Sequence, residues 1–297
     1  LEGCCGIKIF MGSSTGDLLV SEDEFLEKVL RSGKKTIAVH CEDEETLIAR
    51  KHIAEEKAHP VAHPEWRSTE SALKATQRIV SLANKVGRKI HTLHITTADE
   101  MAFLKDNKKN VTVEILPQHM FFSSPDCYEK LGTYAQMNPP IRSKEHQEAI
   151  KKALQEGIVD VIGSDHAPHT KEEKDQTYPQ SPSGLPGVQT IVPIMLNFVN
   201  DGLLSLEHFI KLMSINPARI YKAKGKGGTF VSQDADFTIV DMNRKEVITN
   251  EMMASRCGWT PYNGVEVKGW PVMTIIRGQV VMSEGKALKQ SGAPIQF

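Results

Sequence analysis

Four polar residues interrupt or end short apolar segments of this sequence, and their types suit metal-assisted hydrolysis. They are Lys8 within GIKIFM, His40 at the end of TIAVH, His94 within HTLHI and Asp165 after VIGS. Imidazole nitrogen and carboxylate oxygen are the ligands that zinc takes in hydrolytic centres. Burying an ammonium group without a partner costs several kcal/mol. We therefore predict that Lys8 is buried and either meets an acceptor or is not an ammonium in the folded protein.

Each of these residues also has a simpler interpretation. A single histidine at a strand end is more often a hydrogen-bonded core residue than a ligand. Asp165 alone could cap a helix or belong to a turn, and Lys8 alone could pair with a carboxylate. The metal interpretation is favoured because four such residues lie at the ends of four different predicted strands. Asn138 lies in the long segment after another predicted strand.

The other histidines give weaker signals. His59 and His63 are four residues apart, but a proline follows each of them, so we predict a loop rather than a metal-binding helix. His91 precedes His94 by three residues, which on a strand places the two side chains on opposite faces. We expect only one of this second pair to be a ligand.

Two further sequence patterns give only weak evidence for a functional site. The stretch GSSTGD at residues 12–17 resembles a phosphate-binding loop but lacks the G-x-x-x-x-G-K-[ST] form. Cys41 follows His40 and could be a nucleophile, but the alternation of a strand predicts that it faces away from that histidine.

The elements that must position these residues alternate between strand and helix. Apolar segments predict strands at 6–11, 35–41, 88–96, 111–117 and 158–165, and helical patterns lie between them, near 43–58, 69–86 and 143–157. Further helical stretches follow near 188–200 and 205–213, and we expect irregular structure after 117 and from 170 to 187. Strands separated by helices indicate parallel βαβ units in an α/β fold. Five strands are predicted, whereas a (β/α)8 barrel, which opens its active site at the carboxyl ends of its strands, needs eight.

The pattern of apolar and turn-forming residues changes near residue 225. Beyond that point, short apolar segments alternate with Gly and Asp turns and almost no helical pattern remains. We therefore expect two domains, residues 1–225 with the βαβ units and residues 226–297 as a small all-β module.

Composition excludes several classes of function. The 297 residues carry a formal net charge of −1, which gives no reason to expect nucleic acid or an anionic membrane as a partner. No apolar run reaches the roughly 20 residues of a membrane span. The five cysteines form no C-x-x-C pair, so a reducing, cytoplasmic compartment is expected. Because the chain starts Leu-Glu-Gly and enters a strand almost at once, we also expect it to be part of a longer protein.

Six segments occur in the order found in a known family. They are GIKIFMGSSTG, AVHCEDE, HTLHITTADE, MNPPIR, GSDHAPH and SGLPGV, and DADFTIVD follows near the end. Together they resemble the dihydroorotases of the amidohydrolase superfamily, over essentially the whole chain. That resemblance implies a (β/α)8 barrel, here represented by about its last five strands, and part of a β-sandwich in the all-β module.

The resemblance also implies roles for the polar residues. Lys8 matches a lysine that reacts with CO2 to form a carbamate bridging two zinc ions. His40 and His94 match ligands of the second metal, and Asp165 matches a metal-bound carboxylate that moves protons. Substrate contacts are implied for Asn138, His169, Pro186 and Gly187. Related hydantoinases and allantoinases usually differ at the positions of Asn138 and His169.

The activity implied is the reversible cyclisation of N-carbamoyl-L-aspartate to L-dihydroorotate, a step of pyrimidine synthesis on a small-molecule substrate. A homodimer is compatible with this resemblance. The family also carries a His-x-His pair for the first metal, and this sequence has none. We therefore expect that about a third of the enzyme, with that pair, lies in a missing upstream segment. The alternatives are a hydantoinase- or allantoinase-like hydrolase and a non-catalytic relative that keeps the fold for assembly.

Overall fold

Five parallel strands form the sheet that carries the predicted site residues. In the computed structural model, which describes residues 3–13, 18–288 and 292–297, they occur in the order β1-β2-β3-β4-β5. Their bounds are β1 (Gly6–Phe10), β2 (Thr36–His40), β3 (Ile90–Thr92), β4 (Val111–Ile115) and β5 (Val161–Ile162). The five predicted strands are thus confirmed, but β3 and β5 are shorter than expected. His94 and Asp165, which follow them, adopt left-handed φ angles of 37° and 40°, and this conformation cannot continue a strand.

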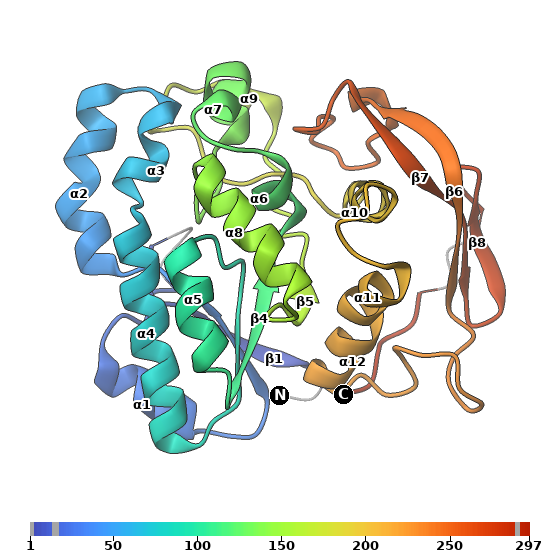
Figure 1. Ribbon diagram of the computed structural model, residues 1–297, viewed down its shortest axis with the longest axis horizontal. Helices are drawn as coiled ribbons and strands as arrows, with labels where there is room; N and C mark the ends of the chain where they lie inside the picture. The colour runs from blue at the N-terminus through green and yellow to red at the C-terminus, as the bar shows by residue number, and fades with distance from the viewer. Residues whose placement is uncertain (1–2, 14–17, 289–291) are drawn as a thin grey trace. The chain divides into compact units, whose positions relative to one another are not determined.

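Helices connect successive strands, as in βαβ units. The longer ones are α1 (Asp23–Arg31), α2 (Glu44–Lys57), α4 (Thr69–Val86), α5 (Ala98–Asp106) and α8 (Lys144–Gln155). Figure 1 shows α1, α4, α5 and α8 packed beside one another against the same side of the sheet. Side chains fix where several of them begin, since Asp43 and Ser68 accept backbone N–H bonds and Thr97 forms a capping box with Glu100.

Segments predicted to be irregular contain short helices. They are η1 (Pro60–Ala62), α3 (His63–Trp66), α6 (Pro117–Phe121), α7 (Asp126–Leu131), η2 (Gly132–Ala135) and α9 (Lys171–Lys174). The loop predicted around His59 and His63 is therefore wrong. Prolines stand in the first turn of η1, α3 and α6, where a missing N–H costs no hydrogen bond, so they begin these helices instead of breaking them.

A buried cluster holds the loops that follow β4 and β5. Its members are Leu116, Cys127, Tyr128, Ala135, Met137, Ile141, Leu185, Cys257 and Trp259. Contacts group residues Gly6–Val188 and Asn250–Pro261 as one compact unit, so the segment with Trp259 and the turn η4 (Asn250–Met252) belongs with the parallel sheet.

The remaining residues form a second unit. It contains α10 (Ile191–Asn200), α11 (Leu206–Ile210), the π-helical turn η3 (Lys211–Ile215), α12 (Asn216–Tyr221) and an antiparallel sheet of β6 (Phe237–Ile248), β7 (Val265–Ile276), β8 (Gln279–Ser283) and β9 (Lys286–Ala287). Asn200 joins α10 to the sheet by donating to the carbonyls of Met242 and Lys268, at 3.1 and 2.8 Å. Gly269 has φ of 100°, and a Cβ there would lie 2.8 Å from Leu196 Cβ, so this close contact requires glycine.

The grouping by contacts does not place the division of the chain at the expected boundary of 225. Residues 189–225 group with the antiparallel sheet. The two expected domains, 1–225 and 226–297, stay a prediction. Within the parts of the chain that the structure describes, no helix is both long and apolar enough to cross a bilayer. All five cysteines are free thiols.

Candidate active site

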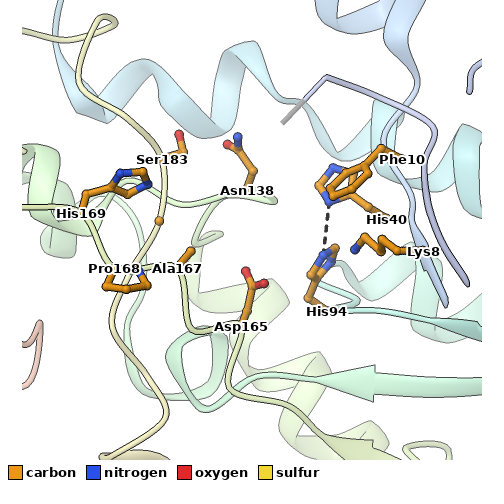
Figure 2. Close-up of a pocket in the computed structure, with 11 residues that line it drawn as sticks. Lys8, Phe10, His40, His94, Asn138, Asp165, Ala167, Pro168, His169 and Ser183 are labelled. Carbon is orange, nitrogen blue, oxygen red and sulfur yellow. Dashed lines mark hydrogen bonds between the residues drawn. The ribbon is translucent and has the colours of Figure 1, made fainter. Parts of the chain in front are cut away.

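A cavity of about 270 Å³ lies at the carboxyl ends of the parallel strands, within the first unit. Figure 2 shows the side chains around it, with Lys8, His40 and His94 on one side and Asn138, His169 and Ser183 on the other. Phe10, Asp165, Ala167, Pro168 and Gly184 complete its lining. Six of the eight predicted site residues therefore line one cavity, and they include the four residues of the strand-end argument, Lys8, His40, His94 and Asp165.

Lys8 faces this cavity from β1, but it is not buried as predicted. Its side chain is exposed, because β1 has only one neighbour in the sheet described by the structure. Its Nζ atom lies 4.5 Å from the centre of the Phe10 ring. The protein atoms that surround the amine displace water and lower the pKa of Lys8, and the charges of Asp165 and Glu114 oppose this shift. A lowered pKa leaves more of the amine in its neutral, nucleophilic form.

His40 and His94 are buried and turn their rings toward each other. His40 Nδ1 lies 3.2 Å from His94 Nε2, the contact drawn as a dashed line in Figure 2. Burial lowers the pKa of both imidazoles, so both are neutral near pH 7. His94 Nδ1 is buried without a hydrogen-bond partner among the described residues.

A chain of buried side chains orients His40 from behind. Its Nε2 lies 2.8 Å from Glu42 Oε2, and the Nε atom of Arg67 donates to both oxygens of Glu42 at 3.1 Å. Glu42 and Arg67 are almost completely buried. The contact with Arg67 and the bond from His40 hold the pKa of Glu42 below its usual value despite burial. An ionised Glu42 can only accept, so the proton of neutral His40 lies on Nε2 and the Nδ1 lone pair points at His94.

These donors fit a zinc ion shared by the two histidines. Two nitrogens bound to one tetrahedral zinc at about 2.0–2.1 Å would lie about 3.4 Å apart, close to the 3.2 Å between His40 Nδ1 and His94 Nε2. A carboxylate–histidine chain such as Glu42–His40 is the usual support of a metal-bound imidazole. Among the described residues, however, no three His, Cys, Asp or Glu side chains gather closely enough to hold a metal, so Asp165 does not complete a three-residue cluster with this pair.

Asp165 points into the cavity from the loop after β5 (Figure 2). Desolvation raises the pKa of its carboxyl group to about 6, with Lys8 lowering it and Glu114 raising it further. A carboxyl group with this pKa can both accept and release a proton near neutral pH. Glu114, on β4, also accepts the backbone N–H of His94 at 3.2 Å and so supports the left-handed turn of that ligand candidate.

The predicted substrate contacts divide into two groups. Asn138 and His169 line the cavity, and Trp259 Nε1 donates to the His169 carbonyl at 2.8 Å. Pro186 and Gly187 do not contribute to its lining, and the backbone N–H of Gly187 donates to His166 Nδ1 at 3.1 Å. Ser183 and Gly184, a few residues earlier, line the cavity in their place.

Sequence reasoning missed the residues that support the site from behind. His63, predicted in a loop, is fully buried and lies 2.9 Å from Asn138 Oδ1. Glu42 could have been noticed as a carboxylate two residues after a strand-end histidine. Cys41 is buried and burial raises the pKa of its thiol, which argues against a nucleophilic role. Part of the GSSTGD stretch, residues 14–17, lies outside the described residues.

Comparison with known proteins identifies the class to which this site belongs. Residues 16–281 match the amidohydrolase family, and the chain belongs to that family. It is 34% identical over 291 residues to a dihydroorotase of Methanosarcina mazei, covering 93% of this chain and 63% of that protein. It is 37% identical over 282 residues to a dihydroorotase of Pyrococcus furiosus, covering 95% of this chain and 62% of that protein. The chain thus spans somewhat less than two thirds of these relatives.

Solved structures of cyclic amide hydrolases share the fold. An L-hydantoinase (dihydropyrimidinase) from Arthrobacter aurescens superposes with a TM-score of 0.93 at 28% identity, covering 99% of this chain and 69% of that one. A dihydropyrimidinase from Brevibacillus agri gives a TM-score of 0.87 at 25% identity, covering 96% and 65%.

Proposed function

We propose that this protein is a zinc-dependent dihydroorotase that interconverts N-carbamoyl-L-aspartate and L-dihydroorotate in pyrimidine synthesis. The observation that carries the proposal is the pair His40 and His94, facing each other at 3.2 Å in a cavity that Lys8 and Asp165 also line. The identities of 34% and 37% to dihydroorotases add support. Under this proposal the parallel sheet is the last part of a (β/α)8 barrel, and the antiparallel sheet belongs to a β-sandwich.

His40 and His94 would hold one zinc ion, and a carbamate formed on Lys8 would bridge it to a second. When bound, the zinc ions would polarise the carbonyl of the cyclic amide and supply an activated water at neutral pH. To supply that anionic ligand, the neutral amine of Lys8 would bond to the carbon of CO2 and release a proton. The second zinc would need the His-x-His pair, which would come from residues outside this sequence.

Asp165 carries the proton in this proposal. With a pKa near 6, its carboxylate accepts a proton from the attacking water and passes it to the ring nitrogen that leaves. In the direction of cyclisation the same carboxyl group runs the transfer in reverse. Asn138 and His169 lie on the side of the cavity opposite Lys8 and the two histidines (Figure 2) and would bind the carboxylate of dihydroorotate. Pro186 and Gly187 do not line the cavity, but they closely follow Ser183 and Gly184, which do, and their backbone would contact the ring.

A hydantoinase-like activity is the second candidate, because the L-hydantoinase from Arthrobacter aurescens superposes over 99% of this chain. A carboxylate is what separates the substrates, since dihydroorotate carries one on its ring and hydantoin does not. A cytoplasmic location and a homodimer belong to the proposal, and the five free thiols are compatible with a reducing compartment.

The decisive experiment measures turnover of dihydroorotate, hydantoin and allantoin by the intact protein, together with its zinc content. We expect kcat/KM for dihydroorotate to exceed the other two, with two zinc ions bound and a mass increase of one CO2 on the peptide with Lys8. Faster turnover of hydantoin or allantoin would establish the second candidate. Absence of turnover and of zinc would instead indicate a non-catalytic relative.

A further inference from the structure

His63 is a buried histidine that the proposed chemistry does not use, yet it contacts a residue of the cavity. It lies at the start of α3, fully buried, with Tyr178 and Asn138 also nearly inaccessible to solvent. Its Nε2 atom lies 3.0 Å from the Met137 carbonyl oxygen and 2.9 Å from Asn138 Oδ1. Its Nδ1 atom lies 3.3 Å from the Tyr178 hydroxyl.

The Met137 carbonyl decides which end of Asn138 faces His63. A carbonyl oxygen can only accept, so His63 Nε2 must carry a hydrogen and donate it. The nearer atom of Asn138 must then also be an acceptor, which is Oδ1 and not the amide nitrogen. This conclusion holds for neutral and protonated imidazole alike, because both carry a hydrogen on Nε2 in this arrangement.

The neutral form is the one present, and Tyr178 completes it. Desolvation lowers the pKa of His63 to about 3, so Nδ1 carries a lone pair and accepts the hydroxyl hydrogen of Tyr178. Trp66, Tyr128 and Tyr178 surround the imidazole edge-on, at 5.7, 6.5 and 5.8 Å between ring centres, and restrict its rotation. The orientation of His63 is therefore fixed by both polar and aromatic contacts.

The consequence lies in the cavity. With Oδ1 engaged by His63, the Nδ2 group of Asn138, with its two N–H donors, is the part of the amide that remains available to a ligand in the cavity that Asn138 lines. This group makes no hydrogen bond to any residue described by the structure. Buried polar atoms without a partner do not include its nitrogen, so the nitrogen is accessible. A ligand oxygen with a negative or partial negative charge can therefore reach it.

We propose that His63 is a positioning residue that presents the amide donors of Asn138 to the substrate, so that the site selects ligands with a carboxylate oxygen at that point. This inference rests on the proposed function, which supplies a substrate carboxylate. Without His63, Asn138 could rotate by half a turn and present its carbonyl oxygen, which would repel such a ligand.

Two substitutions of His63 give a matched pair. The amide nitrogen of His63→Gln reaches the place of imidazole Nε2, whereas that of His63→Asn reaches only the place of Nδ1. In the zinc-loaded intact protein, we expect His63→Asn to raise KM for dihydroorotate on the order of ten- to a hundredfold, which is the loss of one hydrogen bond to a charged group. We expect kcat to change much less, KM for hydantoin to stay the same, and His63→Gln to restore most of the affinity.

A double-mutant cycle shows whether His63 acts through Asn138. If it does, adding His63→Asn to Asn138→Ala raises KM no further. An unchanged KM for dihydroorotate in His63→Asn, an equal rise for hydantoin, or full additivity in the cycle would each overturn the inference. If the His63→Asn protein does not fold, Tyr178→Phe takes its place. We expect this variant to raise KM for dihydroorotate by a smaller factor and to leave KM for hydantoin the same. An unchanged KM for dihydroorotate would count against the inference.

The wild-type measurement separates this inference from the proposed function. If the wild type turns over hydantoin and not dihydroorotate, the proposed function is wrong. The same cycle, followed through KM for hydantoin, then decides whether His63 positions Asn138 toward a carbonyl oxygen of that substrate.

Discussion

The two sides of the cavity are held in different ways. Lys8, His40 and His94 stand on or just beyond β1, β2 and β3, whose ladder pairs Lys8 with Ala38 and Phe10 with His40. Asn138, His169 and Ser183 stand on loops that are held by side chains of other segments. Backbone pairing therefore places the first group, the proposed metal side, with side chains such as Glu42 orienting individual residues, whereas the second group, the proposed substrate side, depends on side-chain hydrogen bonds alone. Substitutions should accordingly separate loss of metal from loss of substrate affinity.

The largest effect is expected on the metal side. Lys8→Ala removes the amine that would become the bridging carbamate, so turnover should fall to background and zinc content should drop. Metal analysis and dihydroorotate turnover measure this, with Lys28→Ala on the exposed face of α1 as the control. Full zinc content and full turnover in Lys8→Ala would show that the strand-borne side does not work as proposed.

The next effect concerns the support of His40. In Glu42→Gln the acceptor of the His40 Nε2 proton is weakened and buried Arg67 loses its counter-charge. We expect zinc affinity to fall about ten- to a hundredfold and the free energy of unfolding to fall by about 3–5 kcal/mol. A chelator titration and a urea denaturation curve measure the two. Glu65→Gln, at an exposed ion pair, should change neither.

The difference between the two sides also explains what the sequence could predict. Hydrophobic runs that end in Lys, His or Asp identify parallel strands and place their ends at one edge, so Lys8, His40, His94 and Asp165 could be brought together without a structure. The long intervals after β2, β4 and β5 contain no such pattern. The short helices there depend on prolines at first-turn positions and on contacts with distant segments, as between Trp259 and His169.

The residues that position the site residues could not be predicted from the sequence for the same reason. His63 lies 75 residues from Asn138 in sequence, and nothing local to either residue predicts their 2.9 Å contact. Burial of Lys8 was predicted from its apolar neighbours, but a strand with a single neighbour in the sheet leaves one face of that residue accessible. Periodicity reports which residues share a face, and it does not report what covers that face.

On the substrate side, a buried lysine gives a pH-dependent effect on stability. Lys174 is completely inaccessible, and its Nζ donates to the carbonyls of Pro182 and Gln136 at 2.7 and 3.3 Å. Desolvation lowers its pKa from 10.5 to about 7. Between these two values the unfolded chain binds more protons than the folded one, so this residue makes stability rise as pH increases from about 7 toward 10.5.

Lys174→Met should remove that rise. Urea denaturation of wild type and variant across this pH range measures it, and the difference in unfolding free energy between them should shift by a few kcal/mol in favour of the wild type as pH increases. A difference that is flat with pH would mean that the ammonium is not desolvated. Lys174 would then contribute less to the stability of the loops with Asn138 and Ser183 than its two contacts with carbonyl oxygens suggest.

The smallest effect is expected for Cys41, which follows His40 just beyond the end of β2 and does not line the cavity. It is buried, its Sγ lies 3.6 Å from the Val39 carbonyl, and burial raises the pKa of its thiol. Cys41→Ala should leave kcat/KM within twofold and lower the free energy of unfolding by only about 1 kcal/mol. Iodoacetamide should also leave the folded wild type active. Because Cys41 does not line the cavity, a large loss of turnover in this variant would contradict the assignment of that cavity as the active site.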